Sequence, residues 1–191
     1  RMDVSARALD PSLTIIGPAR EWGLSRSDEV GFARERGIPV PATMEGPYSI
    51  DVNLWGRSVA GGVLDDPWAE PPEDIYALTT APADAPDVPA LVDIEFEQGV
   101  PTKISGVGMR LVELIQSLET IAGVHGIGRI DMIENRTAGA KSREIYEAPA
   151  AVVLHTAHRE LQAFVTPRDL ERLTSELGVK YADLVYKGLW Y

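Results

Sequence analysis

Apolar positions in the first part of the chain follow helical spacing, interrupted by one short β-branched run. Residues 1–9 have the pattern of a helix, and residues 13–16, which end at Gly-Pro, are typical of a buried strand. Ser25 and Asp28 are three residues apart and predict a capping box that opens a second helix. Gly37 predicts the end of that helix, because glycine readily adopts the left-handed conformation that follows a helix.

A proline-rich, acidic stretch over residues 64–90 then breaks the periodicity. Proline fixes φ and removes a backbone donor, so we expect extended surface chain there rather than regular structure. We expect Trp68, Ile75 and Tyr76 to hold this stretch against the core.

The pattern that follows predicts a hairpin and then a helix. Apolar and acidic residues alternate over residues 92–97, and Gln98-Gly99 turns the chain into a second strand. Apolar residues at helical spacing predict a helix over residues 111–121, which Gly123 ends.

Two further helices are expected towards the end of the chain. Thr166 predicts the N-cap of a helix that Gly178 closes, and a short helix over residues 181–187 follows. A hairpin followed by several helices indicates an α+β fold class. We interpret residues 1–45 as the tail of an α/β domain and residues 46–191 as a domain of mixed strands and helices.

The composition is that of an ordinary globular protein, and it disfavours several functions. The 191 residues are 45% hydrophobic and 25% charged, with a net charge of −11. This charge repels nucleic-acid phosphates and anionic lipid, and no apolar run has transmembrane length, so we expect no nucleic acid and no membrane as partners. The local basic cluster is limited to Arg136, Lys141 and Arg143. The absence of cysteine excludes disulfides and thiolate chemistry and is compatible with a cytoplasmic location.

The most polar stretch runs over residues 126–149. Its two parts, GIGRIDMIENR and KSREIYEAP, combine glycine with side chains of both charges. Glycine lets the backbone approach a ligand closely, and mixed charge suits a zwitterionic small molecule. A solvated loop with surface ion pairs is the alternative that the same charges allow.

Residues 47–58, PYSIDVNLWGRS, form a second candidate stretch. They combine hydroxyl, carboxylate, amide and guanidinium groups at the place where two domains would meet, which favours a ligand cleft. The alternative is a helix start in which Ser49 is the cap and Asp51 lies in the first turn.

Other chemistry has weaker support. His155 and His158 are three residues apart on one predicted helical face, and we expect structural roles for them rather than a metal site, which would need further convergent ligands. No Gly-x-Ser-x-Gly motif is present, and the SGVG run at residues 105–108 lacks the lysine of a phosphate loop, so we expect a plain turn there. We assign no catalytic residue, no cofactor-binding residue and no metal ligand.

Five segments together resemble the argininosuccinate synthase family. They occur in the order and spacing of that family: residues 47–58, 62–68 (GVLDDPW), 125–136, 141–149 and 182–190 (ADLVYKGLW). The resemblance covers nearly all of the chain and is more specific than any single short motif.

The resemblance implies an ATP-dependent carbon–nitrogen ligase of arginine biosynthesis. Members of the family join L-citrulline to L-aspartate through a citrullyl-adenylate and release AMP and pyrophosphate. The implied cofactor is ATP with Mg²⁺, and the implied assembly is a homotetramer. Residues 1–45 would be the C-terminal part of a nucleotide-binding domain of the adenine nucleotide α-hydrolase kind, and residues 46–191 most of the synthetase domain.

By position, the family's citrulline-binding residues correspond to Arg1, Ser49, Ser58, Glu134 and Tyr146. Arg1 is followed by Met-Asp where the family has Phe-Glu. The set suits citrulline, because a guanidinium can bind its carboxylate, a carboxylate can bind its ammonium group, and hydroxyls can bind its ureido end.

The resemblance also implies that functional parts of such a protein lie outside this chain. The family's pyrophosphate loop and aspartate-binding stretch would lie upstream of residue 1, and a C-terminal arm would lie downstream of residue 191. We therefore expect the chain alone to be inactive. The alternative is a non-catalytic citrulline-binding or oligomerisation module that lacks the ATP loop.

Overall fold

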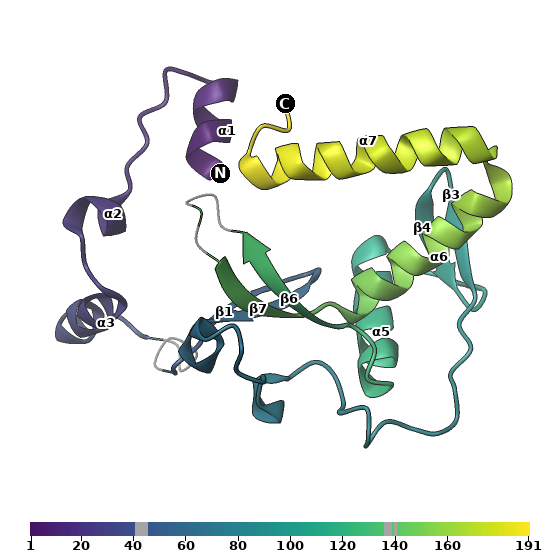
Figure 1. The fold of residues 1–191 in the computed structure, drawn as a ribbon, viewed down its shortest axis with the longest axis horizontal. Coiled ribbons are helices and arrows are strands. Elements are labelled where there is room, and N and C mark those ends of the chain that lie inside the picture. Colours follow the sequence, from purple (N-terminus) through teal and green to yellow (C-terminus); the bar gives the residue numbers. More distant parts are fainter. Residues whose placement is uncertain (41–45, 136–138, 140) are drawn as a thin grey trace. The chain divides into compact units, whose positions relative to one another are not determined.

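A computed structural model describes residues 1–40, 46–135, 139 and 141–191 of the chain. It consists of helices and two antiparallel sheets, which confirms the α+β fold class (Figure 1). The chain forms two compact units: Pro41–Leu161, and Arg1–Val40 together with Gln162–Tyr191. The predicted domain boundary near residue 45 stays a prediction. No helix in the described part of the chain combines the length and apolarity that a bilayer crossing requires.

The unit that contains both chain ends begins with three helices, α1 (Met2–Leu9), α2 (Pro18–Trp22) and α3 (Arg26–Glu35). The capping box at α3 is confirmed: the Asp28 N–H donates to the Ser25 hydroxyl at 3.3 Å, and the Ser25 N–H donates to the Asp28 carboxylate at 3.0 Å. The helix ends before Gly37, as predicted.

Residues 13–16 do not form a strand, so that prediction was wrong. Among the described residues they pair with no other strand, and Ile16 is 73% exposed. A β-branched run becomes a strand only where another strand satisfies its backbone donors and acceptors.

A single long helix, α7 (Arg168–Lys187), replaces the two helices expected near the end of the chain. Its N-cap is Pro167 rather than Thr166, and Gly178 lies inside the helix instead of closing it. The helix ends at Gly188, which has a φ of 77° that glycine adopts at little cost.

A four-stranded sheet in the other unit brings together two hairpins that are distant in the sequence. Neighbouring strands are antiparallel and lie in the order β1 (Ser49–Asn53), β2 (Gly56–Ala60), β7 (Lys141–Glu147) and β6 (Arg129–Asn135). The alternative of a helix start at Ser49 was therefore wrong, and so was the solvated loop after residue 126. Arg136 lies outside the described residues.

One face of this sheet, here called the packed face, lies against the proline-rich stretch. Val59 of β2 and Ile145 of β7 are buried on this face together with Leu64 and Ile75 from the stretch. These four side chains form one of the two cores of the unit, so the proline-rich stretch is part of the packed structure.

The proline-rich stretch is otherwise mostly irregular, as predicted, apart from the short 3-10 helices η1 (Gly62–Asp65) and η2 (Glu73–Ile75). Ile75 and Tyr76 pack on the core, which confirms two of its three predicted anchors. Trp68 is 94% exposed, so its predicted role was wrong. In an irregular segment, the size of an apolar side chain does not determine whether it points inward.

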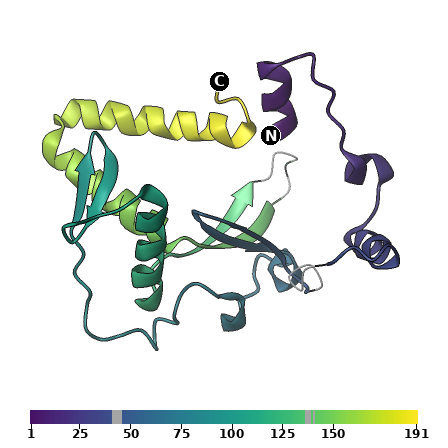
Figure 2. The ribbon, with the colours of Figure 1, turned by 180° about the vertical axis from the view of Figure 1, so that it is seen from behind.

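The second core lies between a small sheet and two helices. The sheet consists of β3 (Ile94–Glu97), β4 (Val100–Ile104) and β5 (Val107–Gly108), and the helices are α5 (Leu111–Val124) and α6 (Pro149–Val165). The β3–β4 hairpin is confirmed, and α6 crosses α5 in both views (Figures 1 and 2). The plain turn at Ser105 and Gly106 is also confirmed. The buried members of this core are Ile104, Leu114, Ile115, Leu118, Ala150 and Leu154.

The helix α5 continues past Gly123, which was predicted to end it. A Cβ atom at Gly123 would lie 2.3 Å from the carbonyl oxygen of Leu78, far inside van der Waals contact. The Thr80 N–H also donates to the Gly123 carbonyl at 2.9 Å. Glycine at this position therefore lets the proline-rich stretch lie directly against the helix.

Two glycines inside helices should respond oppositely to alanine. Gly123→Ala pushes the Leu78 backbone away and should lower the free energy of unfolding by about 1–3 kcal/mol. Gly178→Ala adds a Cβ with no other atom within 4 Å and should raise the free energy of unfolding by about 0.5–1 kcal/mol. Urea denaturation followed by far-ultraviolet circular dichroism measures both, and the same effect from both substitutions would contradict the close contact at Gly123.

Candidate functional site

Four of the five site residues expected from the sequence lie on the second face of the four-stranded sheet. Ser58 pairs with Tyr146 across the β2–β7 ladder. Directly paired residues of an antiparallel ladder point to the same side of the sheet, and so does every second residue along a strand. By the registers of the two outer ladders, Ser49 of β1 and Glu134 of β6 point to this side as well. We call it the site face.

The site face carries a hydrogen-bonded cluster around Tyr146. The phenol oxygen lies within hydrogen-bond distance of two carboxylates. It can donate its proton either to Glu134 or to Oε2 of Glu144, which lies 3.0 Å away. The Ser142 hydroxyl donates to Oε1 of Glu144 at 3.0 Å. Burial raises the pKa of the Tyr146 phenol well above its ordinary value, and the hydrogen bond to Glu134 adds to this effect. The phenol is therefore a hydrogen-bond donor throughout the physiological pH range.

The other two expected residues have different surroundings. Ser49 is exposed on the outer strand β1, at the start of the strand. Arg1 belongs to the other compact unit, where its guanidinium carbon lies 4.0 Å from the ring centroid of Tyr186. A cationic group over an aromatic ring is a favourable contact. The participation of Arg1 in a shared site stays a prediction.

The packed face contains a fully buried carboxylate that the sequence analysis did not single out. Glu147 has no exposed surface and accepts hydrogen bonds from the backbone N–H groups of Ala77, Leu78 and Thr79 at 2.9–3.1 Å. The Thr79 hydroxyl donates to Oε1 of the same carboxylate at 2.7 Å. Arg57 of β2 donates to Oε2 at 2.8 Å. This carboxylate joins the proline-rich stretch to the sheet.

A sequence signal for Glu147 existed, but only in combination with the strand assignment. Glu147 is two residues after Ile145 and therefore points to the same side of β7 as that buried residue. A carboxylate at such a position needs donors, and Arg57 is its direct partner in the β2–β7 ladder. The polar pattern of this segment predicts no strand, so neither relation follows from the sequence alone.

The environment of Glu147 makes folding sensitive to acid. Burial alone would raise the pKa of this carboxyl group, but the backbone donor of Ala77 and the hydroxyl of Thr79 outweigh it, and the pKa lies below its ordinary value. The stabilisation is therefore present above the pKa of the unfolded chain and is lost as the pH falls through the pKa of the folded state.

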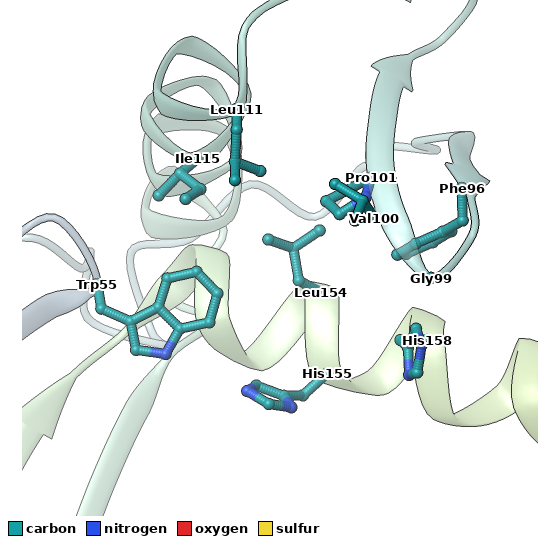
Figure 3. Close-up of a pocket in the computed structure, with 10 residues that line it drawn as sticks. All are labelled: Trp55, Phe96, Gly99, Val100, Pro101, Leu111, Ile115, Leu154, His155 and His158. Carbon is teal, nitrogen blue, oxygen red and sulfur yellow. The ribbon is translucent and has the colours of Figure 1, made fainter.

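A cavity of about 360 Å³ lies in the same unit, between α5, α6 and the β3–β4 hairpin (Figure 3). Apolar side chains such as Leu111 and Ile115 line most of it. His155 packs edge-on against Trp55 with ring centroids 5.9 Å apart, and His158 does the same against Phe96 at 5.7 Å. Both histidines therefore have packing roles, as expected, and no group of three metal-ligating side chains occurs among the described residues.

Comparison with known proteins gives one consistent family. Residues 48–191 match the family model described as "Arginosuccinate synthase C-terminal domain". Proteins named argininosuccinate synthase from Symbiobacterium thermophilum, Gloeobacter violaceus and Oceanobacillus iheyensis are 55%, 52% and 53% identical to the chain over all of its 191 residues. The chain covers 48%, 48% and 46% of these relatives, so it spans about half of their length.

Replacing the buried carboxylate should be far more costly than replacing an exposed one. Glu147→Gln leaves Arg57 without its charge partner and should lower the free energy of unfolding at neutral pH by about 3–5 kcal/mol. It should also flatten the fall of stability below pH 5, because the depressed pKa is lost. The matched control Glu95→Gln removes an exposed ion pair with Lys103 and should cost less than about 1 kcal/mol. Urea denaturation between pH 3 and 7 tests this, and equal costs would contradict the role given to Glu147.

Proposed function

Because the chain belongs to the argininosuccinate synthase family, we propose that it forms the citrulline-binding part of an ATP-dependent ligase that joins L-citrulline to L-aspartate in arginine biosynthesis. The products are argininosuccinate, AMP and pyrophosphate. The single observation that supports this proposal best is that Ser49, Ser58, Glu134 and Tyr146 share the site face.

The proposed reaction needs a site that holds a zwitterion with a polar urea tail. A urea carbon is a poor electrophile until its oxygen becomes part of a leaving group, and ATP supplies the adenylyl group for this purpose through a citrullyl-adenylate. The aspartate amine then displaces AMP. Such a reaction depends on positioning and on stabilisation of phosphate charge, and needs no covalent bond to the protein.

The chemistry of the site face suggests which group meets which end of citrulline. Glu134 is an acceptor for the ammonium group, whereas Ser49, Ser58 and the Tyr146 phenol suit the ureido end. Arg1 is the candidate for the citrulline carboxylate by its position in the family pattern alone. In this arrangement the residues of the chain bind and orient citrulline, and we assign no general base.

The site face does not suit the phosphates of ATP. Glu134 and Glu144 are both on it, and two carboxylates repel a triphosphate. We therefore propose that ATP, with Mg²⁺, and aspartate are bound mainly by residues outside this chain. We further propose that the complete protein is a homotetramer in the cytoplasm and has neither nucleic acid nor membrane as a partner.

The proposal can be tested in a chimera in which residues 1–191 replace the matching segment of the Symbiobacterium thermophilum relative. The chimera should release pyrophosphate only when citrulline is present. Glu134→Gln removes the negative charge that the ammonium group needs and should raise the KM for citrulline at least tenfold, while the KM for ATP stays within twofold.

The matched control is Glu97→Gln, an exposed carboxylate of the small sheet. It removes the same charge at a distance from the site face and should leave both KM values unchanged. An unchanged KM for citrulline in the Glu134→Gln protein would remove Glu134 from the pocket. A chimera that binds citrulline but never releases pyrophosphate would favour the non-catalytic module.

The chain without the rest of the protein should not turn over. We propose that the nucleotide-binding loop of such a ligase lies outside residues 1–191, so mixing the isolated chain with ATP, citrulline and aspartate should release no pyrophosphate above the uncatalysed rate. A coupled pyrophosphate assay measures this, with the chimera as the positive control. Citrulline-dependent release from the isolated chain would overturn the expectation.

A further inference from the structure

Two carboxylates from neighbouring strands meet at one phenol oxygen. Glu134 reaches Tyr146 from β6, and Glu144 reaches it from β7 with its Oε2 atom 3.0 Å from the phenol oxygen. A phenol carries one proton and can donate it to only one acceptor at a time. The two carboxylates are therefore alternative acceptors for the same proton.

The surroundings of the two carboxylates differ. The Oε1 atom of Glu144 accepts the hydroxyl proton of Ser142 at 3.0 Å, so this carboxylate is held in place on its own strand. Ser142, Glu144 and Tyr146 occupy alternate positions of β7 and therefore share the site face. Glu134 approaches from the neighbouring outer strand of the sheet.

We propose that Glu144 is a positioning residue that accepts the Tyr146 proton when an ammonium group of the substrate occupies Glu134. This inference rests on the proposed function, since it takes citrulline as the ammonium-bearing substrate. Binding then exchanges one hydrogen bond for another: the ammonium group donates to Glu134, and the phenol O–H turns to Glu144. No proton is transferred between the phenol and either carboxylate.

The exchange has a consequence for the phenol oxygen. When its proton points along β7 towards Glu144, its lone pairs are available to accept a hydrogen bond from an N–H group of the substrate. Glu144 thereby fixes the direction in which Tyr146 presents its acceptor.

A thermodynamic cycle in the chimera tests the inference. Glu144→Ala should raise the KM for citrulline about 5–20-fold with less than a threefold change in kcat, because it removes the acceptor but no group that touches the reacting atoms. In a Tyr146→Phe background the same substitution should change the KM by less than twofold. Glu144→Gln keeps an amide oxygen that can accept the phenol proton, so it should raise the KM for citrulline at most threefold. This variant serves as a control for an effect that arises from misfolding.

Two results would overturn the inference. One is an unchanged KM for citrulline in the Glu144→Ala protein. The other is an equal loss with and without the Tyr146 hydroxyl, which would indicate a structural effect. Failure of the proposed function would appear in other measurements. The KM for citrulline would be unchanged in the Glu134→Gln protein, or the chimera without substitutions would show no citrulline-dependent release of pyrophosphate. Thermal unfolding of each variant shows that the proteins compared are folded.

Discussion

The contacts of the Glu147 carboxylate are the interaction on which the larger unit depends. Three consecutive backbone N–H groups, one hydroxyl and one guanidinium converge on this buried group. A buried charge is tolerable only with such a complete set of donors. The arrangement attaches the proline-rich stretch, which is mostly irregular, to the packed face of the sheet. The site face remains available for polar groups.

Some local sequence signals predicted the local structure correctly, whereas the helix ends expected at Gly123 and Gly178 were wrong. The capping box of Ser25 and Asp28 and the turn at Gln98-Gly99 depend on residues within a few positions of one another, and both occur as expected. The four-stranded sheet joins residues as much as 90 positions apart, such as Arg57 and Glu147, and no periodicity in one hairpin indicates its partner. For the same reason residues 13–16 were assigned as a strand without any neighbour to pair with.

The site was predicted by a different route. Ser49, Ser58, Glu134 and Tyr146 came from a family resemblance, and the registers that place them on one face were not available from the spacing of polar residues. Glu144 and Glu147 lie in the same strand, but their partners lie on other strands or in the proline-rich stretch. Side chains whose importance arises from distant partners are the ones that sequence patterns miss.

Tyr146 and Glu147 are neighbours in the chain but belong to opposite faces of the sheet. A shift of β7 by one residue would exchange the faces of both, so that a phenol would enter the charged interior and a carboxylate would leave it. Insertions and deletions of a single residue within this strand are therefore doubly unfavourable, whereas a change of two residues would preserve the alternation. In homologous chains, length variation should accumulate outside this strand, even where the individual side chains along it differ.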